Sequence, residues 1–221
     1  MEQAWLRWYD QAGFLLEGAL GRVGIDLFLR PDPRLRAPVC EPRDIPRLDA
    51  ALATHEHHAH RDVYTLQGLQ AHHPAMEVVV PDPIRSLHGV TMEDAYHFGD
   101  PPGRFLGYIV YVGGSAVYHS GDTLMYPELA EVLKDRGVSV VMLPVNGRSF
   151  TREASGLVGN LSPEEAVDLA ADVGAALVPM HWETYPGNGG DIGQTAEWAY
   201  RRGVTLIVPR YQTRIPIMSR S

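Results

Sequence analysis

Cysteine is nearly absent from the sequence: Cys40 is the single one among 221 residues. One cysteine excludes an internal disulfide framework and any metal site built from cysteines, and it is typical of a reducing compartment. Long apolar runs are absent as well, since none approaches the roughly 18–20 residues that a membrane-spanning helix needs. The first residues also lack the basic and apolar segments of a secretion signal. These features predict a cytoplasmic protein that does not insert into a membrane.

Basic residues are in the minority: 19 lysines and arginines stand against 27 aspartates and glutamates, and the formal net charge is −8. Nucleic acids and anionic membranes are therefore not expected as partners, although this balance does not exclude a local basic pocket. A homo-oligomer is compatible with the composition. The sequence also lacks a Gly-x-Ser-x-Gly nucleophile elbow, a Gly-x-x-x-x-Gly-Lys phosphate loop and a dinucleotide fingerprint.

The first part of the chain has the alternating pattern of half-buried strands. Three such segments, separated by glycine-containing turns, are "AWLRWYD", "GFLLEG" and "RVGIDLFL". Their short connections predict an antiparallel meander. A later segment, residues 104–122, predicts a hairpin in which Gly113 and Gly114 supply the positive φ angles of a tight turn.

The last part of the chain alternates helices with strands. The pattern predicts helices over residues 127–137, 162–174 and 191–203, and strands over residues 138–145, 175–180 and 204–209. Ser162, Pro163 and Glu165 form the start signal of the second helix. Strands joined by helices need helical cover, whereas the meander needs a second sheet against its apolar face. We therefore expect a single domain over residues 1–221, an α/β protein built as a four-layer αββα sandwich.

Histidines are concentrated in "THEHHAH", which follows the apolar segment "LDAALA" and holds four of the ten histidines in the chain. In the spacing His55-x-His57-x-x-His60, the first two side chains point the same way on an extended segment, and the third can converge on them after a turn. Three convergent imidazoles favour a metal site. The alternative is an exposed histidine-rich loop without a fixed partner.

The cluster is followed by "AYH" with His97, "SGDT" with Asp122 and "VPMHW" with His181, and this ordered set resembles the metallo-β-lactamase fold hydrolases. Over most of the chain the resemblance is greatest to the branch of L-ascorbate-6-phosphate lactonase. It implies one or two divalent ions, zinc or manganese, and a ligand set in which Asp122 bridges two sites. By this resemblance the first site is formed by His55, His57 and His97, and the second by His60 and His181.

One position departs from the family pattern His-x-His-x-Asp-His, because Ala59 replaces the aspartate that normally binds the second metal. We therefore expect a weaker second site or a single metal. Asp62 could support His60 from behind, or it could cap the following helix. His119, beside the "SGD" turn, is interpreted as a supporting residue of the site or a structural one, and Asp26 as a paired structural carboxylate.

The substrate side of the predicted site is the polar loop 146–160 together with the segment after His181. The loop offers Asn146, Arg148, Arg152 and Asn160. Arginines there could grip a phosphate or carboxylate group, or they could simply be solvated. Tyr185 could close over a ligand or lie at the edge of the core.

A bound metal lowers the pKa of a water molecule and polarises a carbonyl or phosphoryl oxygen, so the expected reaction is hydrolysis. Asp122 is the expected catalytic residue, because it would orient the attacking water or take its proton. The resemblance favours a small anionic lactone as the substrate. The alternatives are a phosphodiesterase of the same fold, or a metal-binding sensor or scaffold without activity, given Ala59.

Overall fold

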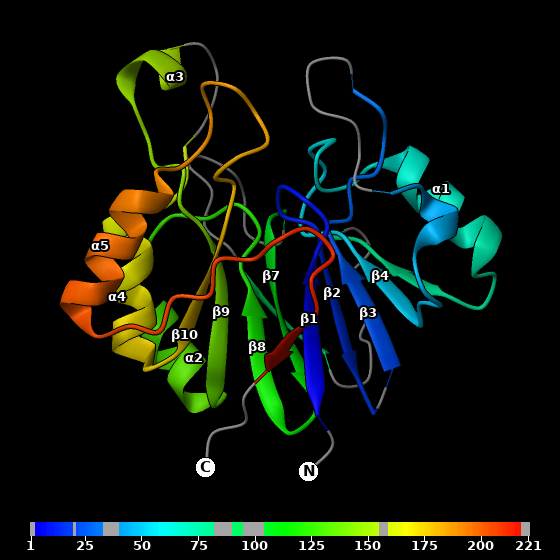
Figure 1. Ribbon diagram of the computed structural model, residues 1–221, viewed down its shortest axis with the longest axis horizontal. Helices are drawn as coiled ribbons and strands as arrows, with labels where there is room; N and C mark the ends of the chain where they lie inside the picture. The colour runs from blue at the N-terminus through cyan, green and yellow to red at the C-terminus, as the bar shows by residue number, and fades with distance from the viewer. Residues whose placement is uncertain are drawn as a thin grey trace.

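The computed structural model describes residues 3–19, 21–32, 40–81, 90–94, 104–154 and 159–217. Within this part of the chain the strands form two sheets (Figure 1). The six-stranded sheet has the order β11-β1-β2-β3-β4-β5 and the five-stranded sheet the order β10-β9-β8-β7-β6. The strands of the six-stranded sheet are β1 (Ala4–Trp8), β2 (Phe14–Gly18), β3 (Gly21–Ile25), β4 (Ala50–Leu52), β5 (Glu77–Val79) and β11 (Ile215–Ile217). Those of the five-stranded sheet are β6 (Val90–Asp94), β7 (Leu106–Val112), β8 (Ser115–His119), β9 (Val138–Pro144) and β10 (Ala176–Met180).

The helices are the 3-10 helix η1 (Pro42–Asp44), α1 (Val63–His72), α2 (Leu129–Asp135), α3 (Phe150–Ala154), α4 (Pro163–Val173) and α5 (Ile192–Arg202). Helix α4 begins as its sequence predicts, because the Ser162 hydroxyl accepts a hydrogen bond from the Glu165 amide and the Glu165 carboxylate accepts one from the Ser162 amide. Helix α5 is capped in a similar way by Asp191.

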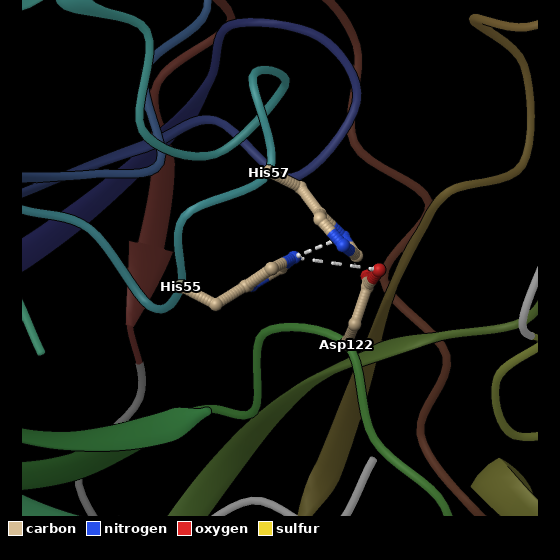
Figure 2. A group of neighbouring side chains, drawn as sticks. All are labelled: His55, His57 and Asp122. Carbon is tan, nitrogen blue, oxygen red and sulfur yellow. Dashed lines mark hydrogen bonds and ion pairs between the residues drawn. The ribbon is translucent and has the colours of Figure 1, made fainter. Parts of the chain in front are cut away.

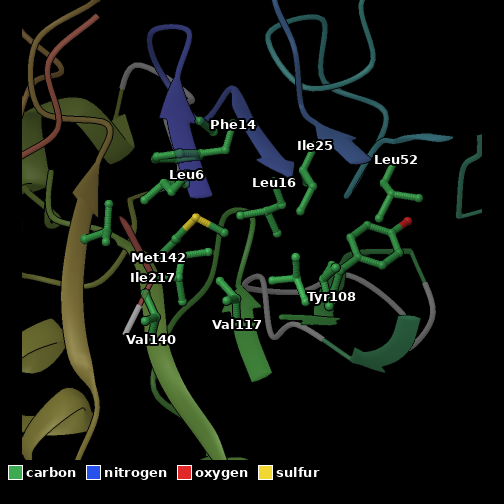
Figure 3. Close-up of a cluster of buried hydrophobic side chains, with 14 of the residues drawn as sticks. Leu6, Phe14, Leu16, Ile25, Leu52, Tyr108, Val117, Val140, Met142 and Ile217 are labelled. Atoms are coloured by element: carbon green, nitrogen blue, oxygen red, sulfur yellow. The ribbon is translucent and has the colours of Figure 1, made fainter. Parts of the chain in front are cut away.

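The two sheets face each other across the main apolar core. Leu16 and Ile25 from one sheet meet Tyr108 and Met142 from the other, and these side chains are almost fully buried (Figure 3). Helices α2 and α4 pack on the outside of the five-stranded sheet and α1 on the outside of the six-stranded sheet. The expected αββα sandwich is therefore confirmed.

The meander and the hairpin also form as predicted. Strands β1, β2 and β3 pair antiparallel, and so do β7 and β8. Gly113 and Gly114 have φ angles of 55° and 80°, the left-handed values that a two-residue hairpin turn needs. The direction of pairing then changes from antiparallel to parallel: β3 pairs parallel with β4, and β8 pairs parallel with β9.

The prediction of a strand over residues 204–209 was wrong. That segment makes a single bridge, Leu206 to Leu177, and β11 forms further along the chain instead. β11 pairs antiparallel with β1 in the other sheet, so that Ile217 lies opposite Ala4. The apolar residue Ile207 packs against the core between the sheets, which accounts for the strand-like pattern of its segment.

Among the described residues, the helices are all too short or too polar to cross a membrane. Strands β8, β9 and β10 are parallel, so β8 and β10 end at the same edge of the five-stranded sheet. The loop after β4 of the other sheet meets them there, because His55 and His60 lie beside Asp122. The chemistry-bearing residues of the sequence follow these strand ends.

Candidate metal centre

Three chain segments bring histidines and a carboxylate together at this end of the sandwich. The loop after β4 carries His55, His57 and His60, the turn after β8 carries Asp122, and His181 follows β10 directly. These side chains form two groups that could each hold a metal ion, with ligand atoms within 4.8 Å of one another. Asp122 belongs to both groups. The location of Asp122 is compatible with the expected bridging role, which stays a prediction from the family pattern.

The first group consists of His55, His57 and Asp122 (Figure 2). Nε2 of His55 lies 3.0 Å from Nδ1 of His57 and 3.7 Å from Oδ2 of Asp122. His55 is fully buried, whereas His57 is exposed. The Phe105 ring stacks on the His55 ring, with 4.5 Å between their centroids, and so covers one side of the group. Sequence reasoning did not find Phe105.

The second group consists of His60, Asp122 and His181. Oδ1 of Asp122 lies 3.0 Å from Nε2 of His181 and 3.4 Å from Nε2 of His60. Within the described part of the chain, neither Asp122 Oδ1 nor His181 Nε2 makes a hydrogen bond of good geometry, although both atoms are buried. Buried polar atoms without such a bond are costly unless another group, such as a cation, satisfies them. This donor set therefore fits a divalent metal ion.

Electrostatics favour the metal-binding form of Asp122 and of His55, whereas Asp122 and Asp26 outweigh the effect of burial on His60 and raise its pKa. Burial would raise the pKa of Asp122, but His181, His60 and His55 outweigh this effect and hold the pKa well below its ordinary value. Burial, together with the neighbouring His60, lowers the pKa of His55 well below its usual range, despite the opposing charge of Asp122. An ionised carboxylate and neutral imidazole are the forms that bind metals.

A buried carboxylate fixes the orientation of His60. Nδ1 of His60 donates to Oδ2 of Asp26 at 2.7 Å, which leaves Nε2 facing Asp122. The Thr54 amide and hydroxyl also donate to Asp26, at 2.8 and 2.7 Å. Such a carboxylate behind a metal-binding histidine fixes its tautomer and raises its basicity. The interpretation of Asp26 as a paired carboxylate agrees with these contacts, and its partner is a member of the second group.

His181 is oriented by a residue that sequence reasoning missed. The side-chain amide nitrogen of Gln11 lies 2.9 Å from Nδ1 of His181, and Nε2 on the other side of the ring faces Asp122. Gln11 lies in the turn between β1 and β2, which Asp10 and Thr184 hold in place through hydrogen bonds to one another and to the Gln11 amide. The sequence signal for Gln11 is weak, because only the polar turn between two apolar strands marks its position.

His119 supports the turn that carries Asp122. Its Nε2 donates to the Ala12 carbonyl at 2.8 Å, and its Nδ1 accepts from the Gly121 amide at 3.1 Å. Burial lowers the pKa of His119, so the ring stays neutral and both bonds persist. These contacts to backbone atoms are compatible with either expected role of His119, a support of the site or a structural residue.

Asp62 caps helix α1, which is one of the two roles proposed for it. Its carboxylate caps α1 by accepting from the amide and the hydroxyl of Thr65, and it also pairs with Arg30 at 3.1 Å. The carboxylate bonded to His60 is Asp26, and the contacts of Asp62 are those of the helix cap that was the alternative interpretation. Ala59 is buried beside this helix start and offers no donor atom.

Two predicted residues are not described. His97 lies outside the described residues, and so does the side chain of Arg152. The role of His97 as a ligand of the first metal remains a prediction from the family pattern.

On the predicted substrate side, three amides form a chain of hydrogen bonds. Asn160 donates to Asn146 at 3.1 Å, and Asn146 donates to Asn188 at 3.2 Å. Arg148 donates to the Asn160 carbonyl at 3.1 Å and pairs with Glu165 at 2.6 Å, so much of its donor capacity is used within the protein. The Tyr185 hydroxyl lies 3.4 Å from Nε2 of His58, next to the histidine cluster.

The fold and the site together define a metallo-β-lactamase type domain. The model of the family described as "Beta-lactamase superfamily domain" matches residues 5–181, and the chain therefore belongs to this superfamily. Among curated relatives, a protein of Pelotomaculum thermopropionicum named "UPF0173 metal-dependent hydrolase" is 26% identical, over 79% of this chain and 82% of its own. One of the same name from Archaeoglobus fulgidus is 28% identical, over 82% and 84%. A shorter match, to a protein of Symbiobacterium thermophilum, is 33% identical but spans only 39% of that relative.

Solved structures support the same fold. The metallo hydrolase Igni18 from Ignicoccus hospitalis superimposes with a TM-score of 0.77 at 17% identity, covering 99% of this chain and 100% of its own. An isothiocyanate hydrolase from Delia radicum gut bacteria gives 0.75 at 17% identity, covering 97% and 99%. At such identities the similarity shows the fold alone.

Proposed function

We propose that the chain is a metal-dependent hydrolase, and that its substrate is a small anionic ester of the lactone type. The observation that carries the first part is the pair of ligand groups that share Asp122. The names of the relatives support the same activity class. The lactone is a finer proposal, supported by the resemblance of the sequence motifs to the ascorbate-6-phosphate lactonase branch.

His55, His57 and Asp122 would hold one ion, and His60, Asp122 and His181 the other. When bound, a divalent ion lowers the pKa of a water molecule towards about 7 and polarises the oxygen of the substrate carbonyl. Imidazole and carboxylate ligands suit zinc, and manganese accepts them as well.

Asp122 would orient the attacking water. Its carboxylate is held ionised beside the surrounding imidazoles, so it can accept a hydrogen bond from the water and align it. The ring of Phe105 against His55 excludes bulk water from one side. A shielded site of this kind strengthens the electrostatic contacts inside it.

The amide chain would contact the polar part of the substrate. Asn160 is buried, and its side-chain oxygen has no hydrogen-bond partner among the described residues, so it can accept a bond from a substrate hydroxyl. The loop is tied next to Asp122, because the Leu161 amide donates to the Thr123 carbonyl at 3.1 Å. Tyr185 and Arg148 would line the outer rim, where the guanidinium is partly exposed.

Ala59 favours a second candidate, a metal-binding sensor or scaffold without activity. A buried methyl group in place of a carboxylate removes one negative charge from the second group, and a weaker second ion would follow. For the same reason phosphodiesters are a less favoured substrate class than lactones, because a phosphodiesterase usually benefits from two metals.

Metal content tests the proposal first. We would measure zinc, manganese and iron per chain by plasma mass spectrometry, on untagged wild type, Ala59→Asp and Asp122→Asn. We expect at least one ion in the wild type, a rise towards two in Ala59→Asp and a loss in Asp122→Asn, since Asp122 serves both groups. Wild-type protein that holds no metal, while folded, would refute the metal centre.

Activity tests the substrate class. Wild type with added zinc or manganese would be assayed on a panel of lactones with and without an anionic group, and on phosphodiesters. We expect hydrolysis of the anionic lactones, lost in Asp122→Asn. A preference for phosphodiesters would favour the phosphodiesterase over the lactonase. A metal-loaded protein without activity on either class would favour the sensor.

A further inference from the structure

A cavity of about 420 Å³ opens at the end of the six-stranded sheet that lies away from the candidate metal centre. It is formed by the start of β1, the end of β2 and the starts of β3 and β4, together with Arg214, the residue before β11. The other ends of β1, β3 and β4, strands that can be followed in Figure 1, lead to Gln11, Asp26 and His55. The cavity and the metal centre thus lie at opposite ends of these strands. The cavity and the metal centre therefore share no lining residue.

Three arginines line this cavity, and two of them surround a nearly buried carboxylate. Glu17, whose side chain is 6% exposed, lies 3.1 Å from Nε of Arg22 and 3.6 Å from Nε of Arg214. Arg7 also reaches Glu17 through Nε, at 2.9 Å. In each of these three contacts the nitrogen nearest to the carboxylate is Nε, the inner nitrogen of the guanidinium. A guanidinium has five N–H donors, and the two oxygens of Glu17 cannot satisfy three such groups.

The charge of the cavity is positive, in contrast to the net charge of −8 on the chain. Its lining holds Arg22, Arg47 and Arg214 against Glu17 and Asp49. Both carboxylates are already paired, because Asp49 binds Arg47 and accepts a hydrogen bond from the Arg22 amide at 2.8 Å. A cation would therefore find the carboxylates already bound, whereas an anion would find donors that remain open.

The cavity is held in shape by its own contacts. Asp49 packs so closely on Gly21 that an added Cβ would lie 2.6 Å from its carboxylate oxygen, and Gly21 has a φ of +138°. The Arg214 guanidinium lies over the Trp5 ring, 4.3 Å from its centroid. A guanidinium placed on an aromatic face is oriented before a ligand arrives, and less entropy is lost on binding.

We propose that this cavity is a binding site for a small organic anion that carries a phosphate or carboxylate group. Its volume lies in the range of about 300–1,000 Å³ that small-molecule sites occupy. The planar guanidinium groups of Arg22 and Arg214 match the paired oxygens of either group. The site is separate from the hydrolytic one, and its ligand need not be a substrate.

Isothermal titration of the metal-loaded full chain tests this proposal, with inorganic phosphate and succinate as separate probes. We expect saturable binding of at least one probe at one site per chain. Arg214→Gln should weaken it about tenfold or more, because it removes a charged donor. Arg47→Gln should weaken it as well, at a position that is 76% exposed and so tolerates substitution.

Arg201→Gln is the matched control. Arg201 also pairs with a glutamate, Glu197, and lies 5.6 Å from the centroid of the Trp198 ring, but it belongs to α5 and not to the cavity. We expect unchanged binding in this variant. Binding that is the same in wild type and in both cavity variants would place the anion outside the cavity and overturn the proposal, as would the absence of binding at millimolar probe. The probe that binds distinguishes a phosphate ligand from a dicarboxylate.

Discussion

Asp122 is the residue on which the candidate centre depends, because its two oxygens face different histidine groups. A single carboxylate can serve both groups only if the turn that carries it is rigid. Gly121 before it has a φ of +59°, and a Cβ at that position would lie 2.6 Å from the Thr54 hydroxyl. The close approach of the two loops at Gly121 therefore brings Asp122 to His55 and His60.

The residue behind His60 gives a prediction of its own. Asp26→Asn should reduce the affinity of the second group for zinc about 10–100-fold, because the amide cannot hold the imidazole tautomer that the carboxylate fixes. Asparagine tolerates the positive φ of +47° at this position, so the backbone should be unaffected. A chelator-competition titration with zinc measures the affinity. Asp168→Asn, which removes a carboxylate that pairs with Arg202 on the surface, is the control and should bind zinc as the wild type does. Equal affinity in Asp26→Asn would contradict the role of this carboxylate.

At the scale of residues, the sequence predicted which histidines lie close together better than it predicted the residues that orient them. The spacing of His55, His57 and His60 predicted a common pocket, and these side chains do converge. The support by Gln11 was not predicted, because it depends on a left-handed turn with a φ of 47° at that residue and on a contact 170 positions along the chain. Asp62 could not be assigned either, since only the position of Thr65 decides between a cap and a metal support.

At the scale of elements, α4 illustrates a helix whose start is encoded locally. Ser162, Pro163 and Glu165 predict the start, and the structure has the reciprocal capping box at that point. The strand expected over residues 204–209 failed for the opposite reason, because strand formation requires a partner along its length. Only Leu206 finds one, on β10. Local signals thus predicted the helix, whereas the tertiary structure decided which apolar segment became β11.

The cap of α4 gives a prediction about stability. Ser162→Ala should lower the free energy of unfolding by about 1 kcal/mol, because the Glu165 amide loses its hydrogen-bond acceptor. In a domain of this size that loss corresponds to a fall of about 2–4 °C in Tm. Ser162→Asp retains an acceptor at the cap and should stay near the wild-type Tm in the same thermal scan. A loss as large in the aspartate variant would mean that the cap bond is not the cause.

At the scale of the whole molecule, the candidate centre connects the two halves of the sandwich. His55, His57 and His60 follow a strand of the six-stranded sheet, and Asp122 and His181 follow strands of the five-stranded sheet. The apolar core between the sheets holds them together along their length. At the end where the loops meet, polar side chains replace that core, so a metal there would act as a cross-link between the sheets.

Metal should therefore stabilise the whole fold, since a ligand set drawn from both sheets is assembled only in the folded chain. At free zinc about 100-fold above its dissociation constant, the free energy of unfolding should rise by about 2.7 kcal/mol. That gain corresponds to about 5–10 °C in Tm for a domain of this length. Thermal scans of chelator-treated protein with and without zinc measure it, and magnesium, which prefers oxygen ligands, should give little shift. Asp122→Asn should lose most of the zinc effect. A shift of equal size in that variant would mean that zinc binds elsewhere and does not join the sheets at the candidate centre.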